Sequence, residues 1–186
     1  MEKRDRLSRA VKTIAWGYIL LHLHFNLGTL DILPDWLGLV LILKALPALT
    51  EQCPSSAVLR PFAVGLAIWE GVEWLFCLFG ASLELGVLGI IGSIAALYFR
   101  FQLITEISRG AEAHNCPQAG RLRILRNVDA VMITLFALPI PWDRFEALSI
   151  LLIIVEICAA LLICGSLFSL SRYLVDPLPY LEQEMN

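Results

Sequence analysis

The residues of this chain with the clearest chemical potential are polar side chains at the end of its first apolar stretch. His22 and Asn26 are four residues apart, so on a helix they would share one face. Asp31 and Asp35 follow on either side of a proline turn. The spacing predicts that these four residues line one polar vestibule that opens outward. The alternative is a plain turn whose aspartates face water and whose histidine hydrogen-bonds a neighbouring helix.

Four acids lie inside later apolar stretches and extend this candidate site. Glu70 and Glu73 are three residues apart and fall on one helical face, and Asp129 and Glu156 lie in the last two stretches. A carboxylate within a bilayer is costly unless it is paired, protonated or hydrated, so each is a functional candidate. With the histidines they could form a proton relay, an ion site or a metal site. They could equally be neutral acids hydrogen-bonded between helices, and the sequence leaves the metal and any cofactor unknown.

Six apolar stretches are the elements that must position these residues. About 20 helical residues cross the roughly 30 Å of hydrocarbon in a bilayer. The chain is 58% hydrophobic and only 17% charged, unlike a typical soluble domain. The predicted spans are Ala10–Leu30, Pro34–Leu49, Pro61–Gly80, Leu83–Ile104, Leu122–Ile140 and Phe145–Leu170. We therefore expect an all-α polytopic integral membrane protein, a six-transmembrane-helix bundle that forms a single transmembrane domain over residues 1–186.

The basic residues predict how this bundle is oriented. With six spans, thirteen of the fourteen Lys and Arg fall on one side of the membrane and only Arg144 falls on the other. The positive-inside rule then predicts a multi-pass protein of the cell membrane with cytoplasmic N- and C-termini. Residues 1–9 would form a short basic N-terminal segment and residues 171–186 a cytoplasmic tail. The net charge of -3 argues against nucleic acid as a partner.

Two of the predicted helices are short and interrupted by proline. Pro34 and Pro47 bracket about 13 residues, which span only ~20 Å as a helix. The fifth stretch ends at Pro139 and Pro141, and both stretches contain Ala-Leu-Pro. Paired broken helices are typical of transporters with inverted repeats and a midplane site. A chance match of three common residues is the alternative.

The cysteines predict no disulfide framework. Their number is odd, three lie within apolar stretches, and two lie in loops assigned to the cytoplasm, where thiols stay reduced. The five are Cys53, Cys77, Cys116, Cys158 and Cys164. We expect all of them to be thiols.

The segment Asn26–Gly38 reads Asn-Leu-Gly-Thr-Leu-Asp-Ile-Leu-Pro-Asp-Trp-Leu-Gly. It resembles a segment shared by small uncharacterised multi-spanning membrane proteins of Gram-positive, especially clostridial, bacteria. The resemblance implies a bacterial membrane protein and brings no activity with it. It gives weight to Gly28, Pro34 and Gly38 beside the polar residues. The six-span plan is also similar to substrate-binding subunits of energy-coupling-factor vitamin transporters, but their Ala-x-x-x-Ala element is absent from the first helix.

The function that these features favour is binding or transport-like handling of a small solute or ion at a polar intramembrane site. The alternative from another class is a non-transporting membrane scaffold or accessory subunit. An intramembrane enzyme is favoured less: His22 and Asn26 resemble an element of CAAX-type proteases, but the glutamates are neither adjacent nor correctly ordered. The lipid bilayer is an expected partner. A small solute or ion, a protein partner and a homo-oligomer stay open.

Overall fold

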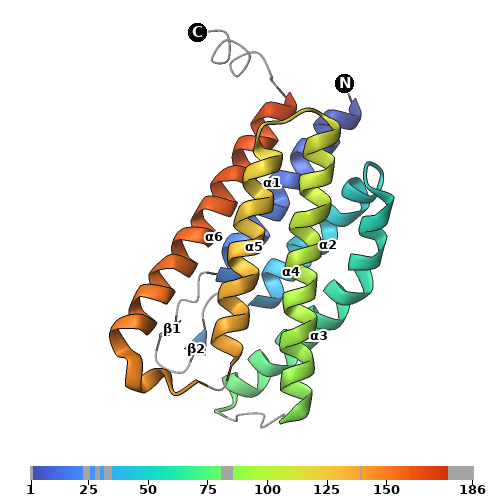
Figure 1. Ribbon diagram of the computed structural model, residues 1–186. Helices are drawn as coiled ribbons and strands as arrows, with labels where there is room; N and C mark the ends of the chain where they lie inside the picture. The colour runs from blue at the N-terminus through green and yellow to red at the C-terminus, as the bar shows by residue number, and fades with distance from the viewer. Residues whose placement is uncertain are drawn as a thin grey trace.

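The computed structural model describes residues 2–22, 26–27, 30–31, 35–80, 86–138 and 140–175. These residues form six α-helices, and Figure 1 shows how they lie alongside one another. They are α1 (Glu2–His22), α2 (Asp35–Thr50), α3 (Leu59–Leu78), α4 (Val87–Ala113), α5 (Gln118–Ala137) and α6 (Glu146–Val175). Two 3-10 helices, η1 (Pro54–Val58) and η2 (Trp142–Phe145), precede α3 and α6. The predicted all-helical class is confirmed.

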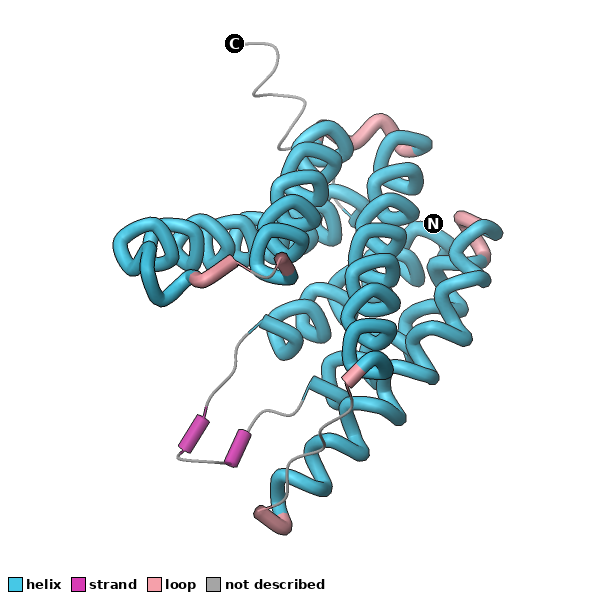
Figure 2. Tube along the Cα trace, turned by 60° about the horizontal axis from the view of Figure 1, so that its bottom comes forward, coloured by secondary structure: helices cyan, strands magenta, loops and turns pink. Residues whose placement is uncertain are grey.

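One small antiparallel ladder lies between α1 and α2. It pairs β1 (Asn26–Leu27) with β2 (Leu30–Asp31), and Asn26 is opposite Asp31. Figure 2 shows this ladder extending from the ends of α1 and α2, and β2 also contacts α3. The side chains of both strands lie outside the described part of the chain.

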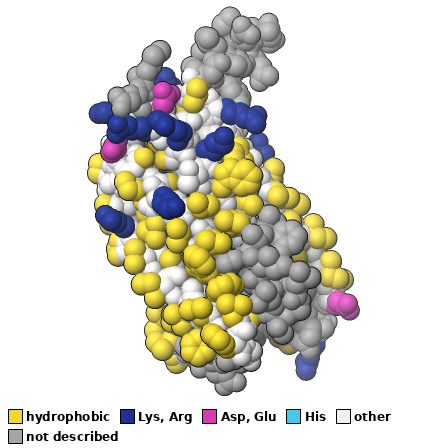
Figure 3. Space-filling view, turned by 180° about the vertical axis from the view of Figure 1, so that it is seen from behind, with side chains coloured by type: hydrophobic (Ala, Val, Ile, Leu, Met, Phe, Trp, Pro, Cys, Tyr) yellow, Lys and Arg dark blue, Asp and Glu magenta, His cyan; other side chains and the backbone are white. Residues whose placement is uncertain are grey.

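The six helices form a closed ring. Each helix packs against the next along the chain, and α6 packs against α1. The beginning of α1 and the end of α6 lie at the same end of this bundle (Figure 1). Figure 3 shows that most of the visible Lys and Arg side chains gather at that end, while hydrophobic side chains cover much of the remaining surface. The ring therefore encloses an interior to which all six helices can contribute.

Two glycines bring α1 and α2 into close contact. A Cβ atom added to Gly38 would lie 2.6 Å from the carbonyl oxygen of Gly17, and one added to Gly17 would lie 2.7 Å from that of Gly38. Real Cβ atoms do not approach backbone oxygens so closely, so only glycine fits both positions. Gly38, to which the resemblance gives weight, thus makes a close backbone approach, whereas Gly28 lies outside the described residues.

The first two helices differ in extent from the predicted spans. Ala10–Leu30 was expected as the first span, but α1 begins at Glu2 and ends at His22. Its basic first turns are helical because lysine and arginine are good helix formers. At its end, the His22 ring also bonds the carbonyl oxygen of Tyr18, one turn earlier in the helix. The predicted shortness of the second helix is confirmed: α2 has 16 residues and contains Pro47.

Among the residues that the structure describes, three helical segments are long and apolar enough to cross a membrane, rather than the predicted six. They are Pro54–Leu78, α4 and α6. The other three helices miss this standard because α2 is short, whereas α1 and α5 carry more charged residues. The apolar segments expose large hydrophobic side chains, among them Ile68, Leu75, Leu88, Ile91, Ile94, Ile150, Ile154 and Leu161. Such a surface matches lipid better than water.

A buried carboxylate ties η1 to α4 near the basic end of the bundle. Glu106 is fully buried and accepts hydrogen bonds from the Ser55 hydroxyl, from Gln102 Nε2 at 2.8 Å and from Arg109 Nη1 at 2.9 Å. Three donors satisfy this carboxylate, as burial of a charge requires. The network holds the α2–α3 connection against α4.

All five cysteines are thiols, as predicted. Burial raises the pKa of Cys116, in the α4–α5 connection, to about 11. Burial, and then the Glu106 charge, also raise the pKa of Cys53. A thiol with a raised pKa is a poor nucleophile at neutral pH.

Candidate functional site

The last residue of α1 points a histidine ring into the bundle. The His22 side chain is only 10% exposed, and its ring stacks on the Tyr18 ring at 4.3 Å between centroids. His22 Nδ1 lies 2.9 Å from the carbonyl oxygen of Tyr18. Because a carbonyl oxygen only accepts hydrogen bonds, Nδ1 carries a proton. In the neutral ring Nε2 is then the basic nitrogen, and it faces the interior.

Two carboxylates, one from α5 and one from α6, lie close to this nitrogen. Asp129 Oδ1, from α5, lies 3.6 Å from His22 Nε2, and the Asp129 side chain is 5% exposed. Glu156, from α6, completes a group in which one nitrogen or oxygen atom of each residue lies within 4.8 Å of the others. Packing of α6 against both α1 and α5 brings the three residues together.

This cluster contains buried polar atoms that the described residues do not satisfy. His22 Nε2, Asp129 Oδ1, Glu156 Oε2 and the Tyr18 hydroxyl have no hydrogen-bond partner there. Tyr18 is fully buried, and its hydroxyl interacts electrostatically with Asp129. Buried polar groups are nearly always satisfied, and each exception costs about 1–3 kcal/mol. The gathering of such atoms from α1, α5 and α6 in one place makes this cluster the first candidate site.

A second group of charged residues lies beside this cluster. Asp35 of α2, Glu70 of α3 and Arg100 of α4 line a cavity of about 20 Å³. Arg100 also interacts electrostatically with Tyr18 and Glu156. The positive charge of Arg100 therefore acts both on the cluster around His22 and on the residues that line the small cavity.

A larger cavity, lined by residues of α3, α4 and α5, also includes Glu70 and Arg100 in its lining. It has a volume of about 410 Å³, and Glu70, Glu73, Ser93 and Arg100 are among its lining residues. The two glutamates do share one face, as their spacing predicted. The polar lining and the volume suit a small polar solute or a hydrated ion.

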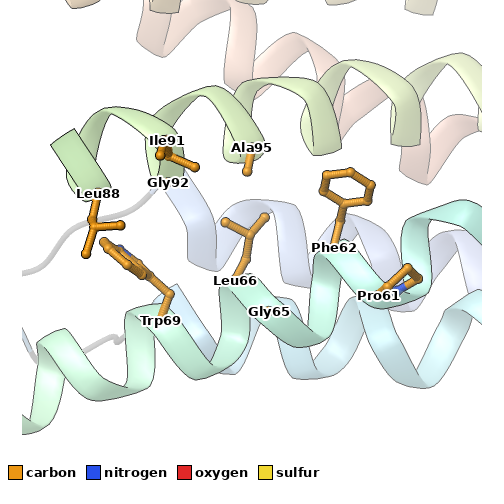
Figure 4. Close-up of a pocket in the computed structure, with 9 residues that line it drawn as sticks. All are labelled: Pro61, Phe62, Gly65, Leu66, Trp69, Leu88, Ile91, Gly92 and Ala95. Carbon is orange, nitrogen blue, oxygen red and sulfur yellow. The ribbon is translucent and has the colours of Figure 1, made fainter.

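A groove of different character lies between α3 and α4. Figure 4 shows Phe62, Leu66 and Trp69 of α3 facing α4, with Leu88 and Ile91 on the other side. Its volume is about 350 Å³, and no charged residue lines it. Such a lining suits hydrocarbon, so the polar cavities remain the candidate site for an ion or polar solute.

The predicted vestibule is described only in part. Asp35 and Glu70 line one cavity, whereas His22 belongs to the neighbouring cluster with the α5 and α6 acids. The side chains of Asn26 and Asp31 lie outside the described residues. The grouping of His22 with all three of its predicted companions thus stays a prediction.

Arg100 is the site residue that sequence reasoning missed. It was counted among the basic residues of the cytoplasmic side, but it lies midway along α4 and lines both polar cavities. The position of Arg100 within an apolar stretch could have identified it as a candidate site residue, because a charge at membrane depth is costly without a role.

A comparison with models of known families, with curated proteins and with solved structures found no match for this chain.

Proposed function

We propose that this chain is a multi-pass protein of the cell membrane with six crossing helices and cytoplasmic termini. The closed ring supports this, because α5 packs between the apolar helices α4 and α6. The pair α1 and α2 likewise bridges α6 and α3. A membrane that surrounds the three apolar helices must then also surround their neighbours. The gathering of basic side chains at the end where α1 begins and α6 ends supports the orientation (Figures 1 and 3).

Cysteine labelling tests this topology. In a background without the native cysteines, an impermeant maleimide should label Arg144→Cys on intact cells. It should label His114→Cys, in the α4–α5 connection, only after the membrane is opened. The positive-inside rule is the physical reason, since Arg144 lies at the end of the bundle opposite the basic cluster. Labelling in the reverse order would contradict the orientation, and labelling of both from outside would contradict the span count.

We further propose that the bundle interior binds a small ion or polar solute. The observation that carries this is the convergence of His22, Asp129 and Glu156, from three helices, on one point with their buried polar atoms unsatisfied. Arg100 and Glu70 extend the polar region to the larger cavity. If these residues served only to hold the helices together, we would expect their polar atoms to hydrogen-bond one another. A scaffold or accessory subunit is the alternative.

A thermal-shift screen of the purified protein against ions and metabolites tests this function. At a concentration 100 times its Kd, a ligand should stabilise the protein by about 2.7 kcal/mol, because it binds only the folded state. Asp129→Asn and Glu70→Gln should remain folded and lose this shift. Glu146→Gln, an exposed residue on the first turn of α6, is the matched control and should keep it. If no compound shifts the wild type, or if both site variants simply unfold, the scaffold alternative is correct.

A further inference from the structure

We propose that His22, Asp129 and Glu156 bind one divalent transition-metal ion, with Zn²⁺ as the reference ion. This inference rests on the proposed function and names the ligand class of the same site. Imidazole suits zinc, iron, nickel and copper, whereas carboxylates alone suit magnesium, calcium and manganese. Imidazole nitrogen and the carboxylate oxygens of Asp and Glu are all zinc ligands.

The orientation of the His22 ring is the first argument. Metal-binding histidines nearly always donate their other ring N–H to a carbonyl or carboxylate, which fixes the tautomer and the ring direction. His22 Nδ1 makes this bond to the Tyr18 carbonyl oxygen at 2.9 Å. Stacking on the Tyr18 ring holds the imidazole further. The ring is thus prepared to present Nε2 as a ligand atom.

The distances are the second argument. Zinc binds nitrogen and carboxylate oxygen at about 2.0–2.2 Å, so two ligands of a tetrahedral ion lie roughly 3.4 Å apart. His22 Nε2 and Asp129 Oδ1 are 3.6 Å apart, and the Glu156 oxygen lies within 4.8 Å of both. A side-chain rotation that brings this oxygen closer by up to about 1.4 Å would complete the three-ligand set, which leaves a fourth position for an exchangeable ligand.

The charges are the third argument. Asp129 and Glu156 lie close enough to repel each other when both are ionised. A divalent ion balances two carboxylates, so the metal complex with a neutral imidazole has no net charge. The alternative to a metal ion at this place is a proton on His22 Nε2. However, 3.6 Å is longer than the 2.7–2.9 Å of a charged N–H···O bond, so the described geometry does not match a protonated His22 bonded to Asp129.

Metal titration of the full chain, purified in detergent and stripped with a chelator, tests the site. Calorimetry with Zn²⁺ at neutral pH should give one ion per chain, and Co²⁺ should give the visible absorption of a tetrahedral site. His22→Gln, Asp129→Asn and Glu156→Gln should each weaken Zn²⁺ binding about 100-fold or more. His114→Gln and Glu146→Gln, a histidine and a glutamate outside the cluster, are matched controls and should bind as the wild type does.

X-ray absorption of the zinc-loaded wild type keeps the test independent of variant folding. The expected spectrum has one imidazole and two or three further oxygen ligands, with no sulfur. Absence of one-to-one binding, retention of binding in the three variants, or a spectrum without imidazole would each overturn the metal site. If the metal fails while another ion or solute gives an Asp129-dependent thermal shift, the proposed function stands alone. If every ligand fails, both are wrong.

Discussion

Replacing Gly38 by valine should destabilise the protein by about 3 kcal/mol, the upper end of what overpacking costs. The first added carbon alone would lie 2.6 Å from the Gly17 carbonyl oxygen, a backbone atom that cannot rotate away. The helices α1 and α2 would have to separate, and the well-packed seam between them would lose contacts along its length. The midpoint of denaturant unfolding in detergent, followed by circular dichroism, measures the loss.

Gly165→Ala, in the apolar helix α6, is the control for this prediction. A Cβ atom there meets nothing within 4 Å, so the change should alter the unfolding free energy by no more than about 1 kcal/mol. Equal losses in the two variants would show that the α1–α2 approach is not specific. The Gly38→Val substitution should also weaken ligand binding, because the contact between α1 and α2 places His22 and Asp35 at neighbouring helix ends.

The sequence predicted the helical class and the residues of chemical interest better than their grouping. Asp129, Glu156 and His22 stand out in the sequence because each interrupts an apolar stretch. Their convergence depends on the closing contact between α6 and α1, and a sequence gives no sign of which helices become neighbours. In a membrane protein this difficulty is general, because residues that face lipid and residues that face other helices are both apolar.

The extent of α1 and the role of Arg100 escaped prediction for related reasons. Apolar content alone cannot separate a helix from the extended chain after it, so the first span was drawn beyond His22 to Leu30. Arg100 was assigned to an interface because most basic residues near a predicted span end lie there. Its position midway along α4 instead places it among carboxylates.

The fold and the site divide the buried carboxylates into two kinds. Glu106 is satisfied by three donors, and this identifies it as a structural group. Asp129 has an oxygen without a hydrogen-bond partner among the described residues, as does Glu156. A structural acid should matter for stability in every condition. A ligand-binding acid should matter mainly when the ligand is present, since neutralising it relieves charge repulsion in the empty site.

Glu106→Ala should therefore lower the unfolding free energy by about 2–3 kcal/mol whether or not any ligand is present. The change removes the acceptor of the Ser55 hydroxyl and the Gln102 amide, and it leaves a cavity between η1 and α4. Arg109 is 58% exposed and keeps its hydration, so it adds little to the loss. Denaturant unfolding measures the effect in ligand-free and ligand-saturated protein.

Glu112→Ala is the matched control on the same helix. Glu112 is 60% exposed and pairs with Arg123 at the surface, so its loss should change the unfolding free energy by no more than about 0.5 kcal/mol. Asp129→Asn should behave unlike both, with a small effect in ligand-free protein and a large one at saturating ligand. If Glu106→Ala costs no more than Glu112→Ala, the network does not hold the α2–α3 connection. If its cost appears only with ligand, Glu106 belongs to the binding site, and the division of the buried acids into structural and binding groups fails.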